Sequence, residues 1–324
     1  MDSGFHLQSL FVDLTPRRAL GTVVAAGIAL APRAAFAHES APPVPHDLWT
    51  AWTFDLVVVV LLLTSAAAFV FGAMKMRARV GRWPGRFRVS ASAFAAGWLV
   101  LAVTLVSPLH ALGSALFSAH MAQHELMMVL AAPLLVASRP IVPAVWSLPP
   151  TGRLWLQRLV HSRGPASMWR FLSRPAVAFL LHGVAIWVWH VPNFYDAAVK
   201  SELAHAAQHA SFLTTALLFW WTILPISPAR RNASSLFSLF GTALHTGLLG
   251  ALLTFSDASW YPAYHAATGP WGLSPLEDQQ LGGLIMWIPG GLTYLVVSLL
   301  TAARFLREPA RGWRENGVAG SLPA

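Results

Sequence analysis

Apolar residues along this chain come in long, almost uninterrupted runs, separated by short polar or basic segments. Seven such runs follow one another, at 51–73, 89–109, 115–137, 175–192, 202–224, 235–255 and 280–303. Each is close to the roughly 20 residues that an α-helix needs to cross the hydrocarbon core of a bilayer. The pattern predicts an all-α fold: a polytopic transmembrane bundle of about seven helices, forming one membrane domain over residues 51–305.

The amino terminus has the pattern of a secretory signal. A short apolar stretch at 19–31 follows two arginines, and Ala35-Phe36-Ala37 then supplies small residues at the spacing that signal peptidase accepts. We therefore expect a cleavable signal peptide at 1–37 and a short outer tail at 38–50. The alternative is an uncleaved short anchor.

The basic residues predict the orientation of the bundle. Of the 22 Lys and Arg residues, 18 fall in the alternate segments that share one side of the membrane: 74–88, 138–174, 225–234 and 304–324. The segments on the other side carry only Lys200, and the remaining three lie in the signal region. Because cytoplasmic loops are enriched in Lys and Arg, we expect the mature amino terminus outside and a cytoplasmic tail at 306–324. The formal charge of +9 then needs no nucleic acid as partner; the expected partner is the lipid bilayer.

Composition supports this reading and removes one class of chemistry. The chain is 56% hydrophobic and 11% charged, and it has no cysteine. Disulfides, thiolate metal sites and thiol redox chemistry are therefore excluded.

Two short histidine motifs repeat within the predicted spans. Ala119-His120-Met121-Ala122-Gln123-His124 matches Ala204-His205-Ala206-Ala207-Gln208-His209 at five of six positions. Residues four apart lie on one face of a helix, so each motif presents two imidazoles in one direction. Both helices run from outside to inside, which predicts that the motifs lie at similar depths. We expect His120, His124, His205 and His209 to form a metal site, with His245 of the sixth span at the same depth.

Further polar residues are accessory candidates. His110 and His190 lie at outer helix ends, Glu125 follows a motif histidine, and Asp278 lies near the start of the last span, where helix capping is the simpler alternative. Imidazole suits copper, zinc, iron and nickel, whereas a nearby thioether such as Met121 favours Cu(I). A structural role for the paired histidines as interhelical hydrogen-bond donors is the alternative.

Several enzyme classes do not fit these residues. His124-Glu125 is not followed by the second histidine of a zinc-protease motif, and no adjacent His-His pair of a di-iron hydroxylase occurs. Haem b between single histidines of facing helices remains an alternative. We expect no enzyme activity.

The chain resembles the CtaG family of caa3-type cytochrome c oxidase assembly factors over residues 48–305. The resemblance lies in Ser107-Pro108-Leu109, the two histidine motifs, Ala132-Pro133-Leu134-Leu135, Trp189-His190-Val191-Pro192 with Tyr195-Asp196, and Asp278-Gln279-Gln280-Leu281-Gly282-Gly283.

This resemblance implies a protein of the bacterial plasma membrane that helps to assemble a copper-containing cytochrome c oxidase. A subunit of that oxidase is then the expected partner, and copper the expected metal. The alternatives are a haem-binding membrane redox protein and a metal transporter.

Overall fold

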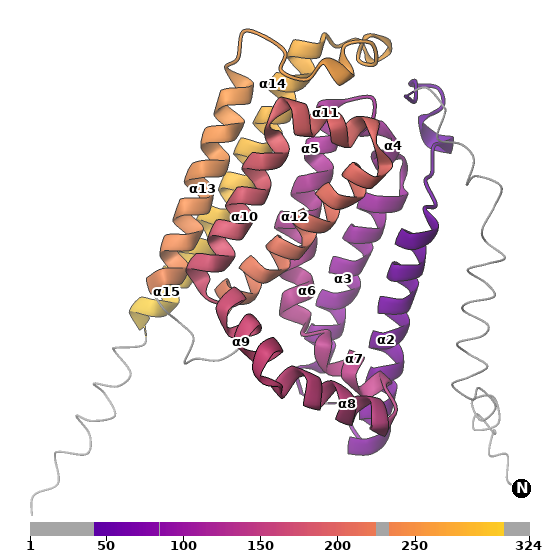
Figure 1. The fold of residues 1–324 in the computed structure, drawn as a ribbon, viewed down its shortest axis with the longest axis vertical. Coiled ribbons are helices and arrows are strands. Elements are labelled where there is room, and N and C mark those ends of the chain that lie inside the picture. Colours follow the sequence, from indigo (N-terminus) through magenta and orange to yellow (C-terminus); the bar gives the residue numbers. More distant parts are fainter. Residues whose placement is uncertain (1–41, 84, 225–232, 308–324) are drawn as a thin grey trace, which may run out of the picture.

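The computed structural model describes residues 42–83, 85–224 and 233–307, and within them every regular element is a helix (Figure 1). The predicted signal peptide and most of the predicted cytoplasmic tail lie outside the described residues. The long single helices are α2 (Leu56–Val80), α3 (Phe87–Val106), α10 (Pro175–His190), α12 (Glu202–Ile223) and α13 (Ala233–Thr254). Two longer segments are composite: α5 (Phe117–Glu125), η3 (Leu126–Ala131) and α6 (Ala132–Ser138); and α14 (Pro275–Ile285), η7 (Met286–Gly290) and α15 (Gly291–Arg307). Short elements join them: η2 (Leu48–Thr50), α4 (Pro108–Leu112), α7 (Ile141–Ser147), α8 (Pro150–His161), α9 (Arg163–Leu172), α11 (Pro192–Lys200), η5 (Pro262–Tyr264) and η6 (Gly269–Trp271).

The multi-pass membrane architecture is confirmed, with a smaller number of clear spans than predicted. Five described segments are long and apolar enough to cross a membrane: Leu56–Val80, Phe87–Val106, Phe117–Ser138, Ser234–Thr254 and Pro275–Ala303. A sixth is added if α9 and α10, which meet at an angle of 72°, form one broken span. Helix α12 has 22 residues but does not meet the same criteria, because histidines and a glutamine near its start lower its mean hydropathy.

The two ends of the bundle differ in character. At one end, called here the basic end, α7, α8 and α9 turn across the bundle (Figure 1) and carry arginines between apolar residues such as Trp155 and Phe171. At the opposite end, called here the histidine end, lie α4, α11 and the start of α14. Both histidine motifs lie towards this second end, at the starts of α5 and α12.

The first long helix begins a few residues later than predicted. Asp55 ends the extended entry segment, and its side chain accepts a hydrogen bond from the Val58 N–H at 2.9 Å, which caps α2. The helix ends at Gly81, whose φ of +74° is strained for any residue with a side chain.

Glycines bring α14 close to both of its neighbours. A Cβ atom at Gly282 would lie 2.3 Å from Cδ1 of Phe117 in α5, and one at Gly283 would lie 2.6 Å from the carbonyl oxygen of Gly250 in α13. Small residues at such contacts let membrane helices approach closely, where dispersion forces hold them. The last composite span is thereby packed against the helix that carries His120.

Candidate metal centre

A carboxylate from α14 holds the start of α5, the helix that carries His120 and His124. Asp278 is fully buried, and its oxygens accept hydrogen bonds from the Phe117 N–H at 2.6 Å, the Ser118 N–H at 3.1 Å and the Ser118 hydroxyl at 2.5 Å. These N–H groups have no partner within their own helix, and a negative charge complements the helix dipole there. The sequence suggested that Asp278 caps its own helix or assists a metal, whereas its contacts make it the cap of α5.

Three of the predicted metal ligands meet between α5 and α12. The Nε2 atoms of His205 and His209 are 3.0 Å apart, as their i,i+4 spacing allows. The His120 ring lies 5.2 Å from the His205 ring and 5.8 Å from the His209 ring, between centroids. One nitrogen from each residue lies within 4.8 Å of the other two, close enough to share one metal ion.

A hydrogen-bond network fixes which nitrogen of His120 faces this group. The Tyr264 hydroxyl donates to the Gly113 carbonyl at 3.0 Å, so it accepts from the Tyr195 hydroxyl at 3.1 Å and from His120 Nδ1–H at 3.2 Å. His120 Nε2 then carries the lone pair, and this buried atom has no hydrogen-bond partner among the described residues. A histidine held through Nδ1 and free at Nε2 is the usual arrangement of a metal ligand.

His124 lies next to these three histidines but is not part of the group whose ligand atoms lie within 4.8 Å of one another. Its ring centroid is 4.4 Å from that of His120 and 5.3 Å from that of His209, and it packs edge-on against Phe212 at 4.6 Å. Both of its nitrogens are buried, with no hydrogen-bond partner in the part of the chain that the structure describes. A buried polar atom left without a partner costs free energy, so His124 is suited to receive a ligand.

His110 joins the cluster from α4. Its ring stacks on His205 with centroids 5.2 Å apart. The Gln123 amide donates to the Thr104 carbonyl at 2.8 Å, which identifies its nitrogen, and the same nitrogen lies 3.0 Å from His110 Nδ1. His110 Nδ1 is therefore an acceptor, and the second motif glutamine, Gln208, is also fully buried.

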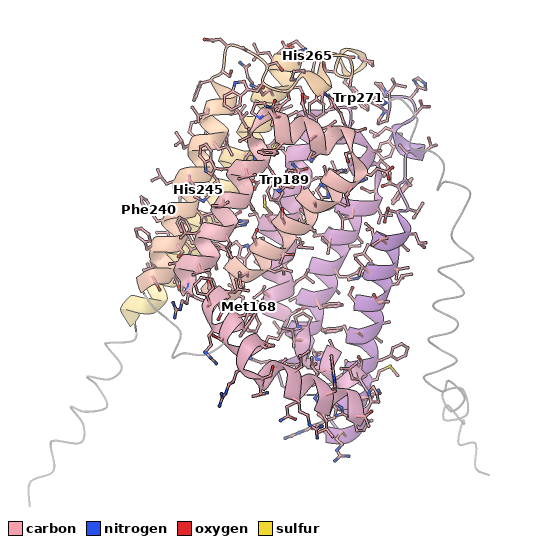
Figure 2. All side chains as sticks on the ribbon, in the orientation of Figure 1. Met168, Trp189, Phe240, His245, His265 and Trp271 are labelled. Atoms are coloured by element: carbon pink, nitrogen blue, oxygen red, sulfur yellow. The ribbon has the colours of Figure 1, made fainter. Side chains whose placement is uncertain are left out.

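His245 lies away from these histidines. It is on α13 facing α10, where a Cβ atom at Gly183 would be 3.4 Å from its Nε2, and its ring packs on Phe179 at 5.8 Å. Figure 2 labels it on α13 at about the height of Trp189, whereas His265 lies at the histidine end. The sequence predicted that His245 shares the depth of the motif histidines. Among the described residues, His245 makes no contact with them.

Two accessory candidates meet at a separate point. His190 Nε2 at the end of α10 lies 3.4 Å from the Met121 Sδ, and both side chains are buried. Glu125, in contrast, faces the last composite span, where a Cβ atom at Gly290 would lie 2.9 Å from its Oε2.

The tyrosines of the histidine end were not predicted as site residues from the sequence, although Tyr195 belongs to one of the motifs that carry the family resemblance. Tyr195, Tyr261 and Tyr264 are fully buried around Phe117 and His120, and burial raises the pKa of each hydroxyl well above its ordinary value. They remain neutral hydrogen-bonding groups. Tyr261 and Tyr264 come from the loop after α13, where no periodic pattern points to burial.

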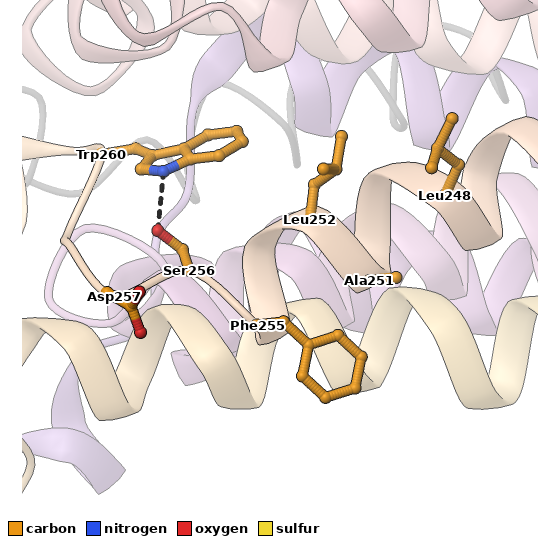
Figure 3. A pocket seen from close by; sticks show the side chains of 7 residues that line it. All are labelled: Leu248, Ala251, Leu252, Phe255, Ser256, Asp257 and Trp260. Atoms are coloured by element: carbon orange, nitrogen blue, oxygen red, sulfur yellow. Dashed lines mark hydrogen bonds between the residues drawn. The ribbon is translucent and has the colours of Figure 1, made fainter.

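An open cavity among the described residues lies elsewhere. It has a volume of about 390 Å³ and is lined by the end of α13 and the following loop: Leu248, Ala251, Leu252, Phe255, Ser256, Asp257 and Trp260 (Figure 3). Trp260 Nε1 donates to the Ser256 hydroxyl at 2.9 Å across it. No histidine lines this cavity, so it has no part in the metal centre.

The chemistry of the cluster follows from its ligands. The three grouped residues are all imidazoles, without a carboxylate or thiolate. Imidazole nitrogen suits copper, zinc, iron and nickel. Neutral imidazoles add no negative charge to offset the charge of a bound metal ion. In an apolar bundle this favours a singly charged cation over a divalent one.

Comparison with known proteins identifies the family. The family model described as "Cytochrome c oxidase caa3 assembly factor (Caa3_CtaG)" matches residues 67–308. Uncharacterized proteins of Mycobacterium bovis and Mycobacterium tuberculosis are each 30% identical over 282 residues, which cover 83% of this chain and 42% of each relative. A protein of Mycobacterium leprae is 29% identical over 296 residues, covering 87% of this chain and 44% of its own length. The chain thus spans less than half the length of these relatives, and no solved structure matches it. Because the family model covers most of the chain and every residue of the histidine cluster, the chain belongs to the cytochrome c oxidase caa3 assembly factor family.

Proposed function

We propose that this protein takes up copper at the outer face of a bacterial plasma membrane and delivers it to a subunit of cytochrome c oxidase during assembly. His120, His124, His205 and His209 bind the copper ion, which is cargo rather than a resident cofactor. The observation that supports this proposal most directly is the buried group of His120, His205 and His209, whose ligand atoms lie within 4.8 Å of one another. The family supplies the context of oxidase assembly.

The ligand set suits transient binding. Thiolates hold copper tightly, whereas imidazoles bind it through neutral nitrogens and release it more readily. His205 is half-buried, so the group is not completely sealed within the bundle.

The topology belongs to the same proposal. We take α12 as a seventh span. Two of the polar residues that lower its hydropathy, Gln208 and His209, are buried inside the bundle and therefore do not face lipid. The arginines of α8 and α9 then face the cytoplasm, as the excess of basic residues at that end favours. The histidine end faces outward.

The alternative that these histidines bind haem is less consistent with the packing of their imidazole rings. A haem held by two of these histidines would have to lie between their rings. The centroids of His120, His124, His205 and His209 are instead 4.2–5.8 Å apart in contacting pairs, which leaves no slot for a porphyrin.

The test is metal analysis with an absorption spectrum on the full chain purified in detergent. The wild type is compared with a His205→Ala/His209→Ala double variant and with His161→Ala, an exposed histidine in α8, as matched control. We expect bound copper in the wild type and the control, a loss of at least one copper ion per chain in the double variant, and no Soret band. A Soret band that the double variant loses would replace the copper function with haem binding.

A second measurement separates assembly from transport. An assembly factor predicts that copper passes to a co-purifying oxidase subunit and that oxidase activity falls in the double variant. Copper uptake into sealed vesicles, without any effect on oxidase activity, would instead identify a transporter.

A further inference from the structure

His190 and Met121 form a contact that ordinary hydrogen bonding does not explain. His190 Nδ1 donates to the Ile186 carbonyl at 2.7 Å, within α10. In a neutral imidazole the other nitrogen, Nε2, then carries a lone pair rather than a proton. That lone pair points at the Met121 sulfur at 3.4 Å, and a thioether has no proton to donate. Two electron-pair donors therefore face each other in the interior of the protein.

Neither side chain can turn to water. Met121 is 0% exposed and His190 is 3% exposed. The Tyr261 hydroxyl donates to the His190 carbonyl at 3.0 Å, which holds the end of α10 in place. The bond from Nδ1 to Ile186 resembles the backbone support that metal-bound histidines commonly have.

The spacing of the two atoms matches that of two ligands on one small ion. Metal–nitrogen and metal–sulfur bonds of about 2.0 and about 2.3 Å, at a tetrahedral angle, separate the two ligand atoms by about 3.5 Å. The observed separation of 3.4 Å is close to this value. An imidazole with a thioether is a soft, uncharged pair, which selects Cu(I) and its analogue Ag(I) over Zn²⁺.

The same helix offers a candidate third ligand. His124 lies three residues after Met121, so both project from neighbouring positions on one side of α5. The His124 and His190 rings both pack on Phe212, at 4.6 and 6.3 Å between centroids. His124 has two buried nitrogens without a hydrogen-bond partner among the described residues.

We propose a second metal subsite, formed by Met121 Sδ, His190 Nε2 and His124, that binds Cu(I). His120, His205 and His209 form the first subsite. His124 lies between the two subsites, and when both are filled it is a ligand of the second. This inference rests on the proposed function, because it takes copper as the ion that enters the cluster. It adds a thioether ligand, a stoichiometry of two and selectivity for the reduced ion.

The test is a titration of the purified full chain with Cu(I) under ascorbate, and with Ag(I), against a competing chelator. Met121→Leu keeps side-chain volume and removes the sulfur, which limits the effect on packing. Met127→Leu is the matched control, since Met127 is equally buried in the same span. We expect two Cu(I) per chain in the wild type and in Met127→Leu, and one in Met121→Leu.

Two further readouts separate metal binding from packing. X-ray absorption should show a copper–sulfur distance of about 2.3 Å in the wild type that is lost in Met121→Leu. Binding of Zn²⁺, which depends on the imidazoles of the first subsite, should be unchanged in that variant. Two Cu(I) per chain in Met121→Leu, or a wild-type spectrum without sulfur, would overturn the second subsite.

The failure of this inference can be distinguished from the failure of the proposed function. In His205→Ala/His209→Ala we expect loss of the first Cu(I) and retention of the sulfur-bound one. A wild type with one Cu(I), lost in the double variant and unaffected by Met121→Leu, would refute the second subsite alone. A wild type without any copper would refute both.

Discussion

The contact between Asp278 and α5 gives a prediction that can be worked out from the structure. In Asp278→Ala the Phe117 N–H, the Ser118 N–H and the Ser118 hydroxyl all lose a charged acceptor. Hydrogen bonds to charged groups contribute about 1.5–3 kcal/mol each, and they are not additive when they share one acceptor. We expect the free energy of unfolding to fall by about 3–5 kcal/mol, the range for removing one partner of a buried charged contact.

The same substitution should weaken metal binding. Ser118 is two residues before His120, so fraying of the first turn of α5 displaces the metal ligand nearest to it. The expected fall in melting temperature, measured by tryptophan fluorescence in detergent, is on the order of 10 °C. Copper affinity should fall at least about tenfold, in the range seen when a residue that orients a metal ligand is lost.

A graded series makes this reasoning refutable. Ser118→Ala removes one of the three donors, and Asp278→Asn keeps one acceptor oxygen, so both should lose less stability than Asp278→Ala. Glu277→Ala is the matched control, because its exposed carboxylate caps only α14 through Ser274. If Asp278→Ala melts with the control, or if it loses stability without losing copper affinity, Asp278 does not position the metal centre.

Three further expectations follow from other contacts. Tyr264→Phe removes the acceptor of His120 Nδ1–H and should lower copper affinity about 10- to 100-fold, measured by chelator competition; unchanged affinity would mean that the tyrosine does not orient the ligand. Gly283→Ala places a Cβ atom 2.5 Å from Thr254 Oγ1 and 2.6 Å from a backbone oxygen, so we expect a loss of at least about 1–3 kcal/mol in detergent unfolding, whereas a fully stable variant would disprove this close packing. The buried hydroxyls of Tyr261 and Tyr264 keep their protons at a pH where unfolded tyrosine, with a pKa of about 10, loses them. The folded state then binds more protons than the unfolded state at high pH, so thermal stability should fall as pH rises above about 10; a rise there would contradict the burial.

Local pattern determined much of this protein. Runs of about 20 apolar residues specify membrane helices because a bilayer core offers the backbone no hydrogen-bond partners, so each segment must satisfy its own. The i,i+4 spacing likewise fixed that His205 and His209 face the same way, since helical geometry depends only on positions within one helix. Hydropathy alone did not identify α12 as a span. This helix carries polar residues that are buried in the bundle, and a hydropathy average does not take their burial into account.

Tertiary structure alone decided which side chains meet across helices. Nothing local to Met121 and His190, or to Asp278 and Phe117, indicates that they touch, because such contacts depend on how helices far apart in the chain rotate and pack. His245 is a second example. Its depth was inferred from its position in a span, but it lies on a face of α13 that packs against α10, away from the motif histidines. A sequence period sets the direction of a residue within its own helix, whereas the pairing of helices is set by close packing over the whole bundle, where residues such as Gly250, Gly282 and Gly283 decide how near two backbones can come.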